Sequence, residues 1–261
     1  NLEMGENLVA GILKNIETLA NVNANQNVAI LTGIKKTNTI LSKEIGKELS
    51  KQTNWDIISR NSHGLDFNDI SSWYQYLVKY DIIINCIANT DSYSKDKTHH
   101  WNINYKSVVR LCNWCNEYNK KLVHISTEFV YANNEYPPTE EDIPSPDNTW
   151  YAYTKLLADE YIKLTSFNYL ICRELHKPNP FPYDKVWKVQ TSGDTVDKIS
   201  NLIIQLINKN ASGVFNVGTG DKWLKELAPK TSKAIPPPFK TPFDTRMDLT
   251  KLNNFLNENN I

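Results

Sequence analysis

The sequence lacks an excess of charge of either sign. Its 29 Lys and Arg residues balance 29 Asp and Glu residues over 261 positions. A chain without net charge has no overall field to attract nucleic acid or an acidic membrane, so we expect neither partner. The sequence also lacks an apolar run near the roughly 20 residues of a membrane-spanning helix. Because its first residues do not follow the signal-peptide pattern, we expect a cytoplasmic protein.

Cysteine is scarce, with four residues, and the pattern of a metal site is missing. Cys86 and Cys172 lie in apolar, strand-like runs, where cysteine usually acts as a small buried hydrophobe. Cys112 and Cys115 form one CxxC within the helical pattern "SVVRLCNWCNEYNKK". A structural zinc site needs about four ligands, and no second pair or matching histidine spacing follows. We therefore expect no metal.

Apolar runs alternate with helical patterns along most of the chain. Strands separated by helices of ten or more residues predict βαβ units and a parallel sheet. The fold class is therefore α/β, a doubly wound, Rossmann-like parallel sheet with a small discontinuous substrate lobe. The expected strands are 28–33, 55–60, 81–88, 121–127, 168–173 and 213–218, and the expected helices are 39–52, 70–80, 104–119, 151–162, 196–209 and 249–259.

The pattern divides the chain into three parts. Residues 1–26 are expected to form an N-terminal helical extension or linker, and residues 27–173 a dinucleotide-binding Rossmann domain. Residues 174–261 are irregular and rich in proline at first. We expect most of them to form a small substrate-binding lobe, with 195–218 returning to the sheet. Ligands of doubly wound folds bind at the carboxyl edge of the sheet, which this lobe would cover.

The turn after the first strand lacks two of the glycines expected in a dinucleotide fold. Gly33 is present, but Lys36 and Thr39 occupy the positions of the other two. Lys36 can still contact a phosphate. Arg60 ends the second strand, where an acid reads the ribose of NAD and an arginine meets the extra phosphate of NADP. This arginine favours NADPH over NADH.

Three residues form a candidate catalytic group. Thr127 ends the fourth strand, Tyr151 follows 24 residues later at the start of a helix, and Lys155 lies one turn beyond it. Positions i and i+4 share a helix face, so the ammonium can approach the phenol and lower its pKa. The phenol would donate a proton to a substrate carbonyl that Thr127 holds. Hydride must come from a cofactor.

These motifs resemble the extended short-chain dehydrogenases/reductases, and within them the dTDP-4-dehydrorhamnose reductases. The matching segments are "WDIISRNSHGLDFND", "DIIINCIANTD", "NIN" at 102–104, "LVHISTEFVY", "YAYTKLLADE", "GVFNVG" and "TRMDLTKL". The resemblance implies that Thr127, Tyr151 and Lys155 are catalytic. It also implies roles for residues near the cofactor and the substrate. The cofactor residues are Gly33, Lys36, Arg60, Asp66, Phe67, Ala88 and Asn104, and the substrate residues are Glu128, Trp150 and Arg173. Trp150 is equally suited to packing in the core.

The activity implied by the resemblance is reduction, by NADPH or NADH, of the 4-keto group of a nucleotide-linked 6-deoxysugar in rhamnose biosynthesis. A homodimer is a further possibility. Two alternatives stay open. The first is a non-catalytic regulatory protein on the same fold, like the β subunit of methionine adenosyltransferase. The second is a nucleotide-sugar epimerase or dehydratase. Related enzymes that epimerise before reducing carry a cysteine soon after the hydroxyl-bearing strand. The segment "EFVYANNEYPP" has none, so we expect no epimerase activity.

Overall fold

The computed structural model describes residues 26–32, 41–59, 63–135, 137–237 and 241–258. Its centre is a six-stranded sheet with the order β10-β5-β4-β3-β1-β2. Every neighbouring pair in this sheet is parallel. The strands are β1 (Val28–Thr32), β2 (Asp56–Ser59), β3 (Ile82–Asn85), β4 (Lys121–Ile125), β5 (Tyr169–Glu174) and β10 (Gly213–Val217). The predicted helix near the N-terminus lies outside the described residues.

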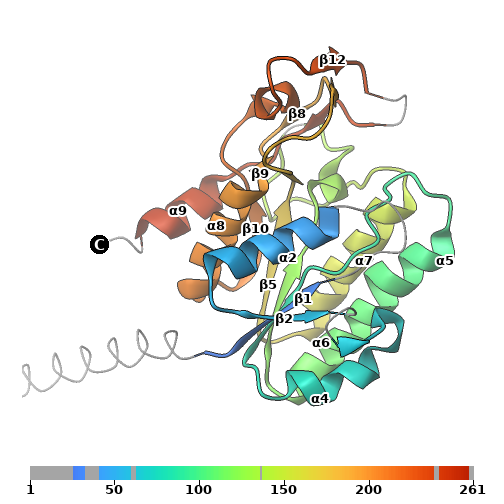
Figure 1. Cartoon of the computed structure of the whole chain (residues 1–261), viewed down its shortest axis with the longest axis vertical. Helices are drawn as coiled ribbons and strands as arrows, with labels where there is room; N and C mark the ends of the chain where they lie inside the picture. Colours follow the sequence, from blue (N-terminus) through green and yellow to red (C-terminus); the bar gives the residue numbers. More distant parts are fainter. Residues whose placement is uncertain (1–25, 33–40, 60–62, 136, 238–240, 259–261) are drawn as a thin grey trace, which may run out of the picture.

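Helices cover both faces of the sheet (Figure 1). Successive side chains of a strand point to opposite faces, so β1 contributes to two apolar clusters. Ala29 and Leu31 belong to the first cluster, and Val28 and Ile30 belong to the second. This arrangement confirms the predicted doubly wound α/β fold. The first cluster is covered by α4 (Tyr74–Leu77), α6 (Ser107–Glu117) and α7 (Trp150–Thr165), and the second by α2 (Leu41–Gln52), α8 (Val196–Asn208) and α9 (Thr250–Glu258).

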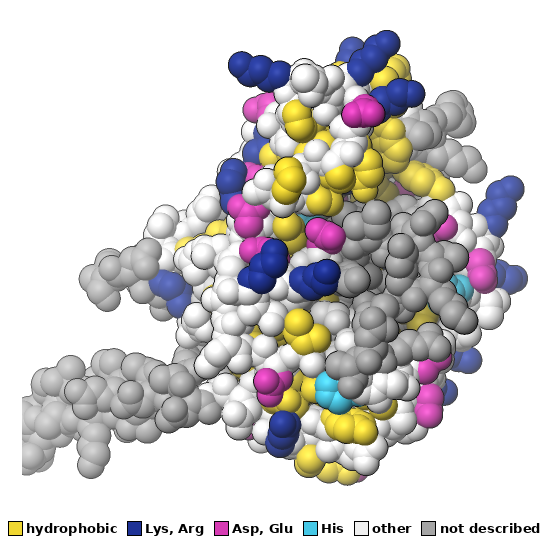
Figure 2. Space-filling view, viewed as in Figure 1, with side chains coloured by type: hydrophobic (Ala, Val, Ile, Leu, Met, Phe, Trp, Pro, Cys, Tyr) yellow, Lys and Arg dark blue, Asp and Glu magenta, His cyan; other side chains and the backbone are white. Residues whose placement is uncertain are grey.

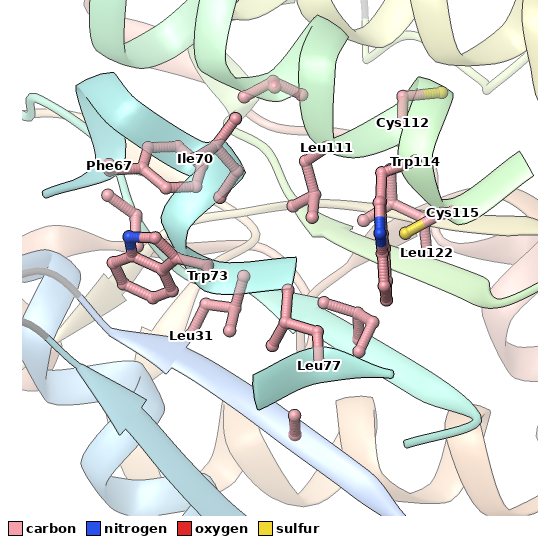
Figure 3. Packing of buried hydrophobic residues seen from close by; sticks show 14 of the residues in the cluster. Leu31, Phe67, Ile70, Trp73, Leu77, Leu111, Cys112, Trp114, Cys115 and Leu122 are labelled. Carbon is pink, nitrogen blue, oxygen red and sulfur yellow. The ribbon is translucent and has the colours of Figure 1, made fainter. Parts of the chain in front are cut away.

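Figure 3 shows the first cluster, in which aromatic and aliphatic side chains from several elements pack together. Trp73 and Leu111 are both buried there. Cys112 and Cys115 lie in the same cluster, so the CxxC pair is part of the hydrophobic core. Within the described ranges, no group of three or more His, Cys, Asp or Glu residues is placed to hold a metal ion.

Two of the expected helices begin differently from the prediction. The segment expected at 70–80 starts as a 3₁₀ helix, η1 (Phe67–Trp73), which Asp66 caps, and becomes α-helical at α4. Asp69 has non-helical angles inside η1. The segment expected at 104–119 is preceded by α5 (Lys97–His100) and a π-helical turn, η2 (Trp101–Lys106). In the described part of the chain, no helix has the length and apolar character needed to cross a membrane.

The rest of the chain after β5 forms mostly a lobe of short strands at one end of the sheet (Figure 1). The lobe also contains a 3₁₀ turn, η4 (Leu224–Leu227). Its strand pairs are β6 (His176–Lys177) with β9 (Asp194–Thr195), β7 (Lys185–Trp187) with β12 (Lys233–Ile235), and β8 (Gln190–Thr191) with both β11 (Lys222–Trp223) and β13 (Asp244–Thr245).

The lobe is joined to the carboxyl edge of the sheet by a buried carboxylate. Glu128 follows β4 and begins the 3₁₀ turn η3 (Glu128–Tyr131). Its carboxylate accepts hydrogen bonds from the hydroxyls of Thr191, at 2.9 Å, and Thr245, at 2.6 Å. These two threonines belong to β8 and β13. The strand ends and the lobe therefore enclose the region where a ligand of this fold is expected.

Candidate active site

The first residues of α7 place a tyrosine and a lysine beside the end of β4. The side chain of Thr149 caps the helix by accepting a hydrogen bond from the Ala152 amide at 3.2 Å. Tyr151 and Lys155 follow on one face of α7, and Thr127 has an extended backbone just beyond β4. The Tyr151 hydroxyl and the Thr127 side chain line the same pocket, and Thr127 acts to lower the pKa of the phenol. The structure thus brings the three predicted catalytic residues to one pocket.

The phenol of Tyr151 is held in its protonated form. Burial raises the pKa of Tyr151, the Thr127 side chain acts in the opposite direction, and the carboxylate of Glu174 raises the pKa further. We expected the ammonium of Lys155 to lower this pKa, so the direction of the shift differs from the expectation. The loss of solvation in the closed pocket favours the neutral phenol.

Lys155 directs its ammonium at strand β4. It donates to the Ile125 carbonyl at 2.6 Å, and its Nζ lies 3.0 Å from Nε2 of His124. Burial lowers the pKa of Lys155 to about 8, although the carboxylates of Asp159 and Glu174 act in the opposite direction. An amine with a pKa near neutrality can exchange a proton readily.

His124 is a buried neighbour of this lysine that no motif in the sequence indicates. Its side chain is fully buried, and burial lowers its pKa well below the usual value. Nδ1 of His124 lies 3.1 Å from Nδ2 of Asn85, whose Oδ1 accepts from the Ile87 amide at 3.0 Å. Because the amide oxygen is occupied, the Asn85 amide group donates to Nδ1.

The pocket around the three predicted residues has a volume of about 120 Å³. Ligand pockets usually measure roughly 300–1,000 Å³, so this part of the cleft is too small for a whole nucleotide. Its lining includes three charged or titratable residues that the sequence analysis did not select: Glu174, His176 and Lys177. Glu174 ends β5, and His176 and Lys177 form β6 directly after it, so a position at a strand end was the available signal.

The predicted cofactor residues do not all lie at the pocket. Gly33, Lys36 and Arg60 lie outside the described residues. Ala88 lines the pocket. Asn104 is buried and does not line the pocket; its Oδ1 accepts from the Asn89 amide at 2.7 Å, and its Nδ2 donates to the Asn89 carbonyl at 3.1 Å. Asn104 therefore supports the loop that follows β3.

The next two predicted cofactor residues begin η1. The carboxylate of Asp66 accepts from the Asn68 amide at 3.0 Å and caps this 3₁₀ helix. The Phe67 ring is buried and makes an edge contact with Trp73, as the labelled side chains in Figure 3 show. In the described structure these two residues order the segment after β2.

The three residues that the sequence assigns to the substrate are placed elsewhere. Glu128 is buried and joins the lobe to the sheet, as described above. Trp150 is 39% exposed and makes an edge contact with Tyr153. Arg173 is fully buried, because its guanidinium pairs with Asp159 at 3.0 Å and lies 4.8 Å from the centre of the Tyr131 ring. A buried ion pair of this kind explains an arginine at a strand end without a substrate.

Comparison with solved structures shows the same fold in several enzymes of nucleotide-sugar metabolism. The dTDP-4-dehydrorhamnose reductase of Bacillus anthracis, solved with NADP, is 21% identical, with a TM-score of 0.72 over 87% of this chain and 92% of that one. A hypothetical dTDP-4-dehydrorhamnose reductase of Sulfolobus tokodaii is 22% identical, with a TM-score of 0.70 over 87% and 93%. MoeE5, solved with UDP-glucose and NAD, is 13% identical, with a TM-score of 0.70 over 88% and 92%. At these identities the likeness establishes the fold.

A search of curated proteins found no match. A family model does match the chain, and its description is the RmlD substrate binding domain. The match extends over residues 30–175, which include β1 to β5 and the pocket residues Thr127, Tyr151 and Lys155. The match covers more than half of the chain, and the fold agrees with it. The chain belongs to the RmlD substrate binding domain family.

Proposed function

We propose that this protein is an NAD(P)H-dependent reductase of the 4-keto group of a nucleotide-linked 6-deoxysugar, of the dTDP-4-dehydrorhamnose reductase type. The observation that carries the proposal is that the phenol of Tyr151 and the hydroxyl of Thr127 line one pocket beside the buried side chain of Lys155. Two hydroxyl donors at one point can hold a carbonyl oxygen, and one of them can protonate it. The reductases that share the fold support the same reaction.

Each of the three side chains has a part in the reaction. Tyr151 donates its proton to the carbonyl oxygen as the oxygen becomes an alkoxide, and its raised pKa keeps the proton on the phenol until then. Thr127 holds the same oxygen by a hydrogen bond. Lys155 places a cation behind them and, with a pKa of about 8, can pass a proton back from solvent. A bound nicotinamide cofactor would supply the hydride.

The walls of the pocket fit the reacting end of a nicotinamide cofactor. One part is apolar and can cover the face of a ring, since it contains Ile45, Cys86 and Ala88. Hydroxyls from Thr90 and Ser92 line another part and can bind ribose or carboxamide groups. We infer NADPH as the preferred cofactor from the arginine that ends the predicted second strand, with NADH as the alternative. The four free and buried cysteines suit a reducing compartment such as the cytoplasm.

The lobe offers room for the nucleotide of the substrate. A second cavity of about 600 Å³ is lined by the rings of Phe181, Tyr183 and Trp187 and shares Lys177 with the first pocket. Figure 2 shows hydrophobic side chains gathered over this lobe. Aromatic faces can stack on a nucleobase, and an ammonium between two cavities can bind a diphosphate. A sugar in the first pocket and a base in the second would be joined through Lys177.

A substitution of the phenol tests the proposal. Tyr151→Phe should reduce kcat with a dTDP-linked 4-keto-6-deoxysugar by about 10²–10⁴-fold, because the proton donor is lost. Binding of NADPH, followed by fluorescence titration, should stay unchanged. Tyr153→Phe is the matched control, since this tyrosine lies on the same helix and is 45% exposed. Unchanged turnover in Tyr151→Phe would refute the assignment. Tight NADPH binding by a wild-type chain without any turnover would favour the regulatory protein.

A further inference from the structure

A carboxylate and an imidazole that the proposed reduction does not use lie on the wall of the same pocket. Glu174 ends β5 and His176 begins β6, and both line the pocket with Thr127 and Tyr151. Nδ1 of His176 lies 3.0 and 2.9 Å from the two carboxylate oxygens of Glu174. The side chain of Glu174 is 5% exposed, and that of His176 is 8% exposed. A pairing with a carboxylate fixes the orientation of an imidazole and prepares both groups for proton transfer.

The pair is electrostatically coupled to the reacting groups. The carboxylate of Glu174 acts on the phenol of Tyr151 and on the ammoniums of Lys155 and Lys177. Glu174 and His176 line the same pocket as Tyr151 and Lys155. A substrate carbonyl that meets Tyr151 therefore presents its neighbouring carbon atoms to a pocket wall that contains a base.

We propose that Glu174 and His176 form a second acid–base site, which removes and returns protons at the carbon next to the keto group of the sugar. The inference rests on the proposed function, because it takes the same keto sugar as substrate. The C–H bond breaks and its proton goes to the Glu174 carboxylate. The electron pair of that bond forms a C=C bond, and the carbonyl π electrons move to the oxygen. Tyr151 and Thr127 hold the resulting enolate oxygen by hydrogen bonds.

The exchange needs no oxidant or reductant, so it proceeds without nicotinamide. The Nδ1–H of His176 donates to the carboxylate and holds Glu174 in place, and deuterium from D₂O can replace the proton on Glu174 before it returns to the carbon. Both members of the pair lie on one wall of the pocket. The proton is therefore removed and returned at the same face, so isotope exchange occurs with retention of configuration. Exchange with retention is compatible with the expectation, drawn from the missing cysteine, that the chain is not an epimerase.

Incubation in D₂O tests the inference. The full chain is mixed with a dTDP-linked 4-keto-6-deoxysugar without NADPH, and the sugar is followed by proton NMR and mass spectrometry. We expect deuterium at the carbon next to the keto group with unchanged configuration. Glu174→Gln and His176→Asn should slow the exchange by at least about 100-fold. Glu258→Gln and His99→Asn, which replace exposed residues, should exchange like the wild type.

Addition of NADPH to the same samples separates the two proposals. Reduction without prior exchange by the wild type would overturn the second site and leave the reductase intact. A wild type that does neither would overturn both. Exchange that persists in both variants, or that inverts the carbon, would overturn the assignment to Glu174 and His176. Where a variant does not fold, Glu174→Asp keeps the charge but shortens the reach, and it should show the same loss of exchange.

Discussion

Arg173 and Lys155 are both fully buried cations at the carboxyl end of the sheet, but their partners differ. The Arg173 guanidinium forms an ion pair with Asp159 and donates to the Tyr131 hydroxyl, away from the pocket lining. The Lys155 ammonium meets a carbonyl and an imidazole and lines the pocket. We therefore assign a structural role to the arginine and a chemical role to the lysine.

A substitution separates these roles. Arg173→Met should lower the free energy of unfolding by about 3–5 kcal/mol, because it leaves the buried carboxylate of Asp159 without its partner. Urea denaturation measures this loss. KM of the folded fraction for the nucleotide sugar should stay within about twofold. Arg110→Met, at an exposed arginine, is the control and should change neither quantity. A large rise in KM with normal stability would instead show that Arg173 binds the substrate.

The sequence predicted part of the site at this scale. Thr127, Tyr151 and Lys155 could be found because a strand end and a helix spacing are local features. Glu174 and His176 were missed, because their position at a strand end was the one available signal and no periodicity there shows which way a side chain points. The direction of the Tyr151 pKa shift also depends on burial, which spacing does not reveal.

At the scale of elements, one glycine determines how closely α2 packs on β1. A methyl group on Gly46 would lie 2.2 Å from Cγ2 of Thr32. Gly46→Ala should therefore lower the free energy of unfolding by roughly 1–3 kcal/mol through overpacking. This loss should occur although alanine favours a helix over glycine by about 1 kcal/mol.

A double-mutant cycle measures this contact. Thr32→Ser removes the methyl group that would clash, so the double variant Gly46→Ala, Thr32→Ser should regain most of the lost stability in urea denaturation. Additive effects of the two substitutions would show that the helix moves away from the strand instead.

The regular elements were predicted well, whereas the short ones were missed. Five of the six sheet strands fall within their expected ranges, and β5 extends one residue beyond its range, to Glu174. The strands of the lobe have only two or three residues, as in β8 (Gln190–Thr191) and β7 (Lys185–Trp187). A period of two cannot be recognised in so short a segment, and their pairing depends on contacts far apart in the sequence.

At the scale of the whole molecule, Glu128, which joins the sheet to the lobe, makes the stability of the protein depend on pH. Burial raises the pKa of its carboxyl from 4.5 to about 8, against the hydrogen bonds from Thr245 and Thr191 and the charge of Lys177. Glu174 adds to the rise. The folded chain thus prefers the protonated form. The raised pKa therefore contributes to the free energy of unfolding. This contribution has its full value below pH 4.5 and is lost as the pH rises through about 8.

Glu128→Gln should therefore flatten the pH profile of stability. In the wild type this one group makes the free energy of unfolding fall by up to about 1.4 kcal/mol per pH unit within that window. Urea denaturation at pH 5 and pH 8 gives the difference for each protein. Glu258→Gln is the control and should keep the wild-type slope. Equal slopes in wild type and Glu128→Gln would mean that the carboxylate stays ionised in the folded state.

The four cysteines described with the core give the protein an unreactive set of thiols. All are unpaired and buried, and burial raises the pKa of each. Since the thiolate is the reactive form, alkylating reagents and peroxides should react only slowly with the folded protein. The same four sulfur atoms become available when the core opens. Thiol modification of this chain would thus record how often its interior meets solvent.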